Sequence, residues 1–303
     1  MIMKPLSHES GLWTGLRAVA RRLRTPSRPA GSPVITRRHG AHATAEGRVA
    51  LVGAGPGEVE LLTLRAARLL GQADAVVYDR LVGDDILELI QPGAERYYVG
   101  KACGHHSVSQ ADIGALLVRL AGEGKSVVRL KGGDPGVFGR MGEELAALAE
   151  AGIESDIVPG ISAASGAAAA MGIPLTDRSC AQRLHMVTAH ACHPDQEPDW
   201  SSLARRDETL VFYMGLSRAV DIARSLMAAG LPADWPMMLI SSASLPEQQA
   251  LIGTLGDMPD RLAEHSLSSP CLIVVGRVVS LAAGATAQPS AGVSNHVRSG
   301  AWP

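Results

Sequence analysis

Aromatic side chains are scarce in this chain, since only ten of its 303 residues are Trp, Tyr or Phe. Proteins that bind single-stranded nucleic acid stack bases on aromatic side chains, so this scarcity argues against such a surface. Residues 1–45 hold eight Lys or Arg and one acidic residue, Glu9, whereas the whole chain has a net charge of −2. The remainder is therefore acidic. An acidic body is not a general binder of polyanions, and we predict no nucleic-acid partner.

Cysteines are also few, and no two of them form a C-x-x-C pair. We predict that all four are reduced thiols, as in a cytoplasmic protein. The histidines occur as His105-His106 and His190-x-x-His193, without further ligands at the spacing of a zinc site, so we predict no metal. The four cysteines are Cys103, Cys180, Cys192 and Cys271.

An uninterrupted apolar run that could cross a membrane is lacking. Residues 157–176 carry no charge, but Pro159, Gly160, Gly172 and Pro174 interrupt them, which indicates a buried loop and an Ala-rich helix. The N-terminal segment has no apolar core of a secretory signal. We therefore predict a cytoplasmic protein that makes no contact with a membrane.

Both ends of the chain have the composition of disordered segments. Residues 1–46 are basic and punctuated by Pro and Ser, and residues 283–303 are rich in Ala, Gly and Ser. We predict a disordered basic extension at the first and a disordered tail at the second. A transit peptide would share the Arg-rich, acid-poor composition of the extension, so that interpretation stays open.

From Arg48 onward, short apolar runs alternate with helical periods, which is typical of βαβ units around a parallel sheet. Ser109 and Asp112 form a capping-box pattern, and the apolar residues behind them share one helical face. Another helix should begin after Thr63 and end at Gly71. We expect strands at 49–52, 75–78, 126–131 and 153–158, and a third helix over 143–151.

After residue 164 this rhythm changes, and short strands become more frequent. We expect strands at 184–189, 209–213, 237–241, 250–254 and 271–275, with helices near 217–229 and 257–266. The sequence therefore predicts an α/β fold in two α/β domains. The first, residues 47–164, should hold a mainly parallel sheet, and the second, residues 165–282, a mixed sheet.

The loop Gly53-Ala54-Gly55-Pro56-Gly57 directly follows the first predicted strand. A dinucleotide-binding G-x-G-x-x-G loop would need glycine where Glu58 stands, and Pro56 lacks a backbone N–H for a pyrophosphate. The loop could bind a neutral or cationic ligand closely, or it could be only a tight turn. A dinucleotide oxidoreductase is therefore disfavoured.

A second glycine-rich loop, residues 131–140, follows the predicted strand 126–131. It contains Gly132, Gly133, Gly136 and Gly139, more glycine than turn chemistry alone requires. Asp134 supplies an acceptor that suits a cationic ligand. Because the carboxyl ends of parallel strands meet at one edge of a sheet, we expect the two loops to converge on one ligand-binding crevice.

Together with these loops, further segments occur in an order that closely resembles the tetrapyrrole methylases, in particular the uroporphyrinogen-III C-methyltransferases. The resemblance covers roughly residues 47–282. The matching segments are GAGPG at 53–57, VVYDRLV at 76–82, VGK at 99–101, VRLKGGDP at 128–135, FGR at 138–140, EEL at 143–145, VPGISA at 158–163, GIPLT at 172–176, LVFYMG at 210–215 and IVVGRVV at 273–279.

This resemblance implies two α/β domains with a cleft between them, S-adenosylmethionine as methyl donor and S-adenosylhomocysteine as product. It implies methylation of uroporphyrinogen III at C2 and C7 to give precorrin-2, for sirohaem or cobalamin. It also implies a homodimer. The N-terminal extension is too short for the dehydrogenase and ferrochelatase domain of some relatives, so a monofunctional enzyme is expected.

The resemblance further implies roles for single residues. Asp79 would be the proton acceptor and Lys101 the proton donor. Ser241–Ser244 departs from the family's ENGT-like segment, which makes Ala243 a weaker match. The implied cofactor contacts are Pro56, Gly132, Gly133, Asp134, Val137, Ser162, Ala163, Met214 and Ala243. Because Arg binds carboxylates bidentately, we expect cations to hold the substrate's carboxylates. The candidates are Arg80, Lys131 and Arg140, with Arg178 and Arg183 beside them.

Three other functions remain open at this point. The chain could methylate a later corrin intermediate, a diphthine residue on a protein or an RNA ribose, although the YDRLV and VGK segments favour uroporphyrinogen III. It could be a dinucleotide oxidoreductase, although the spacing of its glycines argues against that function. It could also be a binding module without catalysis, although the presence of Asp79, Lys101 and Asp134 argues against that function.

Overall fold

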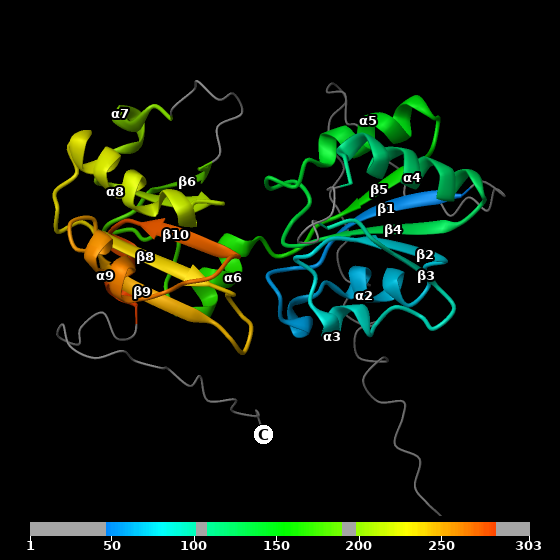
Figure 1. Ribbon diagram of the computed structural model, residues 1–303, viewed down its shortest axis with the longest axis horizontal. Coiled ribbons are helices and arrows are strands. Elements are labelled where there is room, and N and C mark those ends of the chain that lie inside the picture. The colour runs from blue at the N-terminus through cyan, green and yellow to red at the C-terminus, as the bar shows by residue number, and fades with distance from the viewer. Residues whose placement is uncertain (1–46, 101–107, 190–197, 283–303) are drawn as a thin grey trace, which may run out of the picture. The chain divides into compact units, whose positions relative to one another are not determined.

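The computed structural model describes residues 47–100, 108–189 and 198–282 (Figure 1). These residues form two five-stranded sheets, each with helices on both faces. No helix within these ranges is long and apolar enough to span a membrane. The predicted α/β fold with two sheets is confirmed.

The first sheet is entirely parallel, with strand order β3-β2-β4-β1-β5. All five strands therefore end at the same edge, where α/β sheets bind ligands. Its strands are β1 (Arg48–Gly53), β2 (Ala75–Tyr78), β3 (Glu95–Tyr98), β4 (Ser126–Lys131) and β5 (Ser155–Val158).

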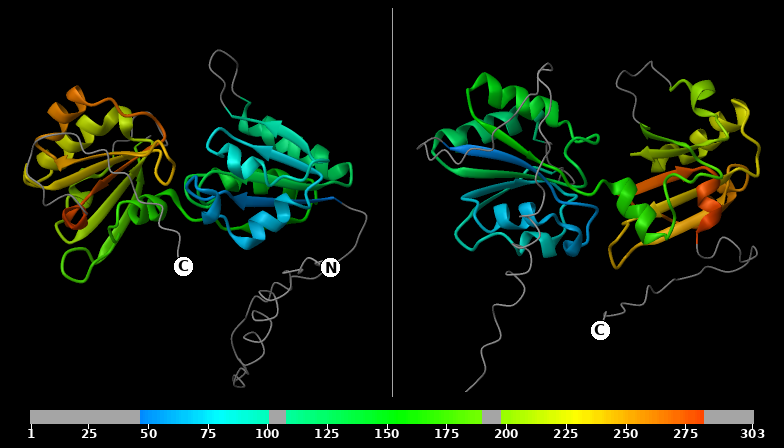
Figure 2. Two further views of the ribbon diagram at one scale, coloured as in Figure 1. Left: turned by 90° about the horizontal axis from the view of Figure 1, so that it is seen from below. Right: turned by 180° about the vertical axis from the view of Figure 1, so that it is seen from behind.

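Alternate residues of these strands face two helical layers (Figures 1 and 2). Val128 and Leu130 of β4 pack toward α2 (Leu64–Leu70) and α3 (Asp84–Leu87). Val127 packs toward α4 (Gln110–Gly122) and α5 (Met141–Glu150). The cap at Thr63 and the capping box of Ser109 and Asp112 form as predicted.

The second sheet is mixed, with order β6-β7-β10-β8-β9. β6 and β7 are parallel, whereas β10 is antiparallel to both β7 and β8. β7 and β8 consequently run in the same direction and end at the same edge. The strands are β6 (Arg183–Thr188), β7 (Glu208–Tyr213), β8 (Pro236–Ser241), β9 (Gln249–Thr254) and β10 (Cys271–Val275).

Two apolar layers cover the faces of this sheet. One contains α8 (Ala219–Ala228), α9 (Met258–Glu264) and the short α7 (Trp200–Leu203). The other contains α6 (Ala163–Ala170) and the 3-10 helix η3 (Arg277–Leu281). α6 is the Ala-rich helix expected within the uncharged stretch, and its alanines pack with the second sheet. Two further 3-10 turns, η1 (Val59–Leu61) and η2 (Leu216–Arg218), complete the described elements.

Some elements differ from the prediction. β3 and α3 were not expected, since β3 is a largely exposed edge strand and α3 is a single turn. α5 begins two residues earlier than predicted, and β5 begins two residues later. These shifts fall at element ends, where local sequence constrains the backbone least.

Candidate functional site

Three glycine-bearing loops meet in backbone contact at the carboxyl edge of the parallel sheet. They follow β1, β4 and β5, which are neighbours in that sheet. Gly55 and Gly133 exchange two backbone hydrogen bonds, with N–O distances of 3.1 and 2.7 Å. A Cβ on Gly53 would lie 2.5 Å from the Gly160 nitrogen, so only glycine fits this approach. The two loops of the sequence converge as predicted, and a third loop joins them.

Asp134 fixes the shape of this loop cluster. Its Oδ1 accepts a hydrogen bond from Gly136 N at 2.8 Å, and its Oδ2 accepts one from Gly160 N at 3.0 Å. The side chain is half-buried. Its carboxylate thus has a backbone partner on each oxygen, and each oxygen keeps a lone pair for a ligand. The predicted cofactor contact at Asp134 stays a prediction.

Asp79 lies directly after β2 at the same edge. Its Oδ1 accepts from Leu81 N at 3.1 Å, and its Oδ2 lies 3.4 Å from Arg129 Nη2. The side chain is 26% exposed. The carboxylate therefore shapes the turn after β2 and still presents a surface to solvent, as a proton acceptor must.

Lys131 lies deeper than the sequence suggested. Its Nζ donates to both oxygens of Glu144, at 2.8 and 2.9 Å, and the side chain is only 6% exposed. Burial lowers the pKa of Lys131, the neighbouring Arg129 cation lowers it further, and the bonds to Glu144 raise it. An ammonium held in this way would have to leave Glu144 before it could bind a substrate carboxylate.

Backbone strain marks the loops that follow β4, β7 and β8. Residues in the left-handed region other than glycine are costly, and they gather where a function requires them. The predicted cofactor contact Met214 is one of these residues, and two others flank the predicted contact Ala243. The strained residues are Phe138, Arg140, Met214, Ser242 and Ser244, with φ between 49° and 67°.

Tyr213 connects several predicted residues and was not itself assigned a role from the sequence. Its hydroxyl accepts a hydrogen bond from Ala164 N at 3.1 Å, next to Ser162 and Ala163 at the start of α6. Its ring centroid lies 4.9 Å from that of Phe138, in the loop after β4. Burial raises the pKa of the Tyr213 hydroxyl, so it stays a neutral donor. No local sequence pattern signals this role, which depends on contacts between distant segments.

A hydrogen bond also joins the loops after β1 and β8. Glu58 N donates to Ser244 Oγ at 3.3 Å, and Ser244 N donates to Gln248 Oε1 at 2.8 Å. These contacts bring the loop of Ala243 to the loop of Pro56. The structure thus brings together most of the predicted cofactor residues from both sheets.

The predicted substrate cations occupy different surroundings. Arg80 is exposed after Asp79, and Arg140 is exposed and pairs with Glu143 at 2.7 Å. Arg183, at the start of β6, pairs instead with Asp207 and Glu208 at the start of β7, and its candidate role toward the substrate stays a prediction. The predicted cofactor contact Val137 is half-buried, and its backbone N–H donates to Asp134 O at 3.1 Å. The predicted proton donor Lys101 lies outside the described residues.

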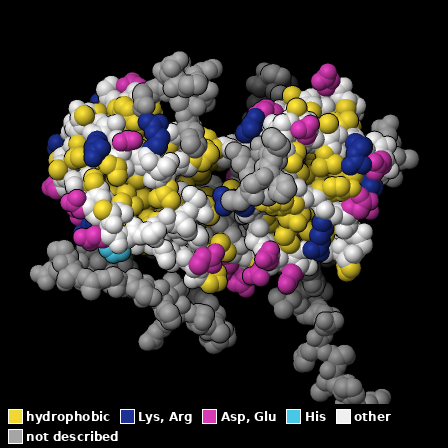
Figure 3. Space-filling view, viewed as in Figure 1, with side chains coloured by type: hydrophobic (Ala, Val, Ile, Leu, Met, Phe, Trp, Pro, Cys, Tyr) yellow, Lys and Arg dark blue, Asp and Glu magenta, His cyan; other side chains and the backbone are white. Residues whose placement is uncertain are grey.

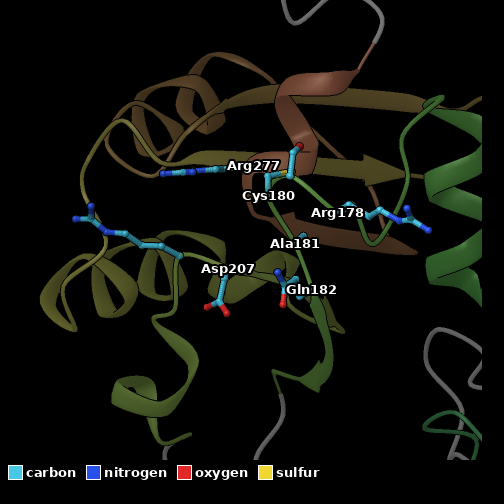
Figure 4. Close-up of a pocket in the computed structure, with 8 residues that line it drawn as sticks. Arg178, Cys180, Ala181, Gln182, Asp207 and Arg277 are labelled. Atoms are coloured by element: carbon cyan, nitrogen blue, oxygen red, sulfur yellow. The ribbon is translucent and has the colours of Figure 1, made fainter.

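A small cavity of about 90 Å³ lies beside Asp207 (Figure 4). Arg178 lines it, although the guanidinium groups of Arg178 and Arg277 point away from each other. The cavity contains none of the residues of the loop cluster. Arg178 thus lies beside residues outside the loop cluster, and its candidate role toward the substrate stays a prediction.

On the face shown in Figure 3, Lys and Arg side chains lie scattered among acidic and apolar ones. Within residues 47–100, 108–189 and 198–282, no three His, Cys, Asp or Glu side chains form a group able to hold a metal ion. The histidine pairs singled out in the sequence fall outside these ranges.

Comparison with known proteins points to one family. Residues 48–259 match the model of the tetrapyrrole (corrin/porphyrin) methylases. Siroheme synthase of Acinetobacter baylyi is 51% identical over 236 residues, which cover 78% of this chain and 52% of that protein. Siroheme synthase of Chromobacterium violaceum is 50% identical over the same length. The chain thus spans about half the length of these curated relatives.

Solved structures show the same similarity over a complete chain. The native uroporphyrin III C-methyltransferase of Thermus thermophilus is 40% identical, with a TM-score of 0.67, and the match covers 78% of this chain and 100% of that one. A structure of that enzyme complexed with S-adenosyl homocysteine matches equally well. A cobalt precorrin-4 methyltransferase is 27% identical, with a TM-score of 0.69.

Proposed function

Because the chain belongs to the tetrapyrrole methylases, we propose that it transfers methyl groups from S-adenosylmethionine to two ring carbons of uroporphyrinogen III, C2 and C7, to give precorrin-2. The observation that carries this proposal is the full-length match to uroporphyrin III C-methyltransferase at 40% identity. The convergence of the glycine loops, Asp79 and Asp134 at one sheet edge supports it independently.

The loop cluster fits an adenosyl sulfonium better than a dinucleotide. Pro56 has no N–H to donate to a pyrophosphate. The backbone N–H groups of Gly55 and Gly133 donate to each other's carbonyl oxygens and are not free for a phosphate. A Cβ on Gly132 would lie 2.6 Å from Leu81 Cβ, so glycine keeps this position open. Met214, 48% exposed on a strained backbone, presents an apolar side chain at the end of β7.

These residues would hold the methyl donor from two sides. Pro56, Gly132, Gly133, Asp134 and Val137 belong to the loops of the parallel sheet. Ser162 and Ala163 at α6, together with Met214 and Ala243, belong to segments packed on the mixed sheet. When bound, S-adenosylmethionine supplies an electrophilic methyl group, and the electron pair of the broken C–S bond stays on sulfur.

The chain's own residues align the substrate and remove a proton. Formation of the new C–C bond leaves one positive charge on the substrate ring, and loss of one ring proton restores neutrality. We assign this proton to Asp79, whose carboxylate is held by Leu81 N and Arg129 beside the loop cluster. Arg80 and Arg140 are exposed cations at the same edge and would bind substrate carboxylates.

The decisive experiment incubates the protein with uroporphyrinogen III and S-adenosylmethionine and identifies the products by mass spectrometry. We expect substrate carrying one and then two added methyl groups, and calorimetric binding of S-adenosylhomocysteine but not of NAD or ATP. Methylation of a corrin intermediate alone would reassign the substrate. Tighter binding of NAD would exclude the proposal.

Asp79→Asn tests the proton acceptor within the same assay. A positioned general base contributes about 10²–10⁴-fold in rate, so turnover should fall within that range. Affinity for S-adenosylhomocysteine should stay nearly unchanged, because the carboxylate acts on the substrate. Normal turnover of Asp79→Asn would remove this residue from the mechanism while leaving the proposed activity intact.

A further inference from the structure

Two cations point from the centre of the parallel sheet into an otherwise apolar layer. Arg129 and Lys131 lie two residues apart on β4 and therefore face the same side, toward α4 and α5. Their side chains are only 4% and 6% exposed. Glu144, fully buried in the first turn of α5, lies between them.

The Glu144 carboxylate organises this cluster. Its Oε1 accepts from Arg129 Nε at 3.0 Å, from Lys131 Nζ at 2.8 Å and from Gln110 Nε2 of α4 at 2.9 Å. Its Oε2 accepts from Lys131 Nζ at 2.9 Å. Oε1 thus accepts three hydrogen bonds and Oε2 accepts one, from donors on β4 and α4, which holds the carboxylate in one orientation.

The other donors of Arg129 are equally fixed. Nη1 donates to Leu130 O at 2.9 Å, and Nη2 faces Asp79 Oδ2 at 3.4 Å. The contact to Asp79 is longer than the contact to Glu144. Arg129 therefore interacts with two carboxylates, the buried Glu144 and Asp79 at the edge of the sheet.

Stability alone does not explain this arrangement. Buried ion pairs lose much of their attraction to desolvation, and apolar residues of similar volume are often as stable. The layer around the cluster is built from such residues, among them Leu117 and Leu148. A network of two cations and two carboxylates that ends at Asp79 is better explained by a role at Asp79.

We propose that Glu144 is a positioning residue for the proton acceptor, holding Arg129 so that its guanidinium orients Asp79 without binding it as a tight ion pair. This inference rests on the proposed function, in which Asp79 accepts the substrate proton. If Glu144 lost its charge, Asp79 would be the one charged carboxylate in the described part of the chain still paired with Arg129, and the attraction between Arg129 and Asp79 would become stronger. Asp79 would then be a weaker base.

Glu144→Gln tests the proposal with little change of shape, since its amide oxygen can still accept from Arg129. Among the described residues, the charged groups that face Glu144 are Arg129 and Lys131 from β4 and Arg140 directly before α5, with Asp79 beyond Arg129 after β2. Removal of one negative charge should move the acidic limb of the rate profile about half a pH unit or more to lower pH. The turnover number should fall about tenfold, and affinity for S-adenosylhomocysteine should not change.

Two variants separate charge from packing. Glu144→Asp keeps the charge and should keep the acidic limb where it is. Gln110→Met removes the neutral partner of the same Glu144 oxygen and should also leave the limb in place. A shift of the limb in Gln110→Met as large as in Glu144→Gln would mean that packing, not charge, controls Asp79.

A second measurement does not depend on activity. Carbon-13 NMR of aspartate-labelled protein follows the Asp79 carboxyl through a pH titration, with Asp79→Asn identifying its signal. In Glu144→Gln the midpoint should move to lower pH, and an unchanged midpoint would overturn the proposal. A shifted midpoint in a protein that does not methylate uroporphyrinogen III would sustain the role of Glu144 and refute the proposed function.

If Glu144→Gln alone does not fold, the double variant Glu144→Gln/Lys131→Met removes one charge of each sign. We expect it to fold and to return the Asp79 midpoint to its wild-type position, because the charge around Arg129 is again balanced. If the Asp79 midpoint in the double variant were half a pH unit or more below its wild-type position, the proposal would be contradicted.

Discussion

Asp134 uses its two carboxylate oxygens on two different segments of backbone. One oxygen closes its own loop at Gly136, and the other reaches Gly160 in the loop after β5. Hydrogen bonds to a charged acceptor are stronger than neutral ones, and losing that acceptor leaves two amides unpaired. The residue therefore has a structural role whether or not a ligand is bound.

We expect Asp134→Ala to lower the free energy of unfolding by about 1–3 kcal/mol and to weaken S-adenosylhomocysteine binding at least about tenfold. Urea denaturation and calorimetry measure the two effects. Asp134→Asn keeps one acceptor oxygen and should show a smaller loss of both. Asp207→Ala, which breaks an exposed pair at the opposite edge of the second sheet, should change neither by much. Wild-type affinity in Asp134→Ala would contradict the role of this loop in binding.

Cys271 gives the protein a defined response to alkaline pH. Burial in β10 raises the pKa of its thiol from 9.0 to about 12. Above pH 9 the unfolded chain releases this proton while the folded chain keeps it. The contribution of the thiol to stability is therefore complete below pH 9 and is lost progressively as the pH rises toward 12.

This loss amounts to at most about 1.4 kcal/mol per pH unit. Urea denaturation at pH 8, 9 and 10 should show it as a difference in slope between the wild type and Cys271→Ala, in which the thiol is absent. Equal slopes in the two proteins would show that the thiol is accessible to water in the folded state.

At the scale of elements, α6 approaches the first glycine loop very closely. A Cβ on Gly166 would lie 2.4 Å from Pro56 Cβ, closer than two carbon atoms can pack. Glycine at this position allows the helix to approach the predicted cofactor loop. Relief of the overlap would require one of the two segments to move.

We expect Gly166→Ala to lower the free energy of unfolding by about 1–3 kcal/mol, as overpacking does, and to weaken binding of S-adenosylhomocysteine. Gly142→Ala in α5 is the matched control, because nothing lies within 4 Å of its new Cβ. Alanine is favoured over glycine in a helix by about 0.5–1 kcal/mol, so this control should be neutral or more stable. Thermal unfolding and calorimetry compare the two, and equal behaviour would refute the close approach.

Elements with a strong local pattern could be predicted from the sequence. β2 matches its predicted residues, and the caps at Thr63 and Ser109 begin their helices where expected. β3 could not, because its Glu, Arg and two Tyr side chains lie mostly exposed at an edge, without apolar alternation. Its position follows from pairing with β2, a long-range contact.

The candidate site shows the same division. Glycines in loops after strands were visible in the sequence, and the pairing of Gly55 with Gly133 follows from β1 and β4 being neighbours. The burial of Lys131 was not visible, because Glu144 reaches it from a helix 13 residues later. Tyr213 likewise acts through Ala164, 49 residues away along the chain.

At the scale of the whole molecule, residues 47–282 account for both sheets and all four apolar cores that the structure describes. The match to the methylase family begins at residue 48, within one residue of this body. Gly47 already abuts the end of α4, since a Cβ there would lie 2.1 Å from Ala121 O. The folded unit that carries the proposed activity should therefore be contained in residues 47–282.

We expect a protein of residues 47–282, preceded by a single Met, to bind S-adenosylhomocysteine with the affinity of the full chain. Its free energy of unfolding should stay within about 2 kcal/mol, because a larger loss is the mark of a removed packing contact. A protein that starts at Ala54 is the informative control. It lacks β1, which lies between β4 and β5, so the parallel sheet cannot form and the protein should not fold. Calorimetry and urea denaturation of the three proteins decide the matter, since a loss of affinity in the 47–282 protein would assign part of the binding site to the segments outside it.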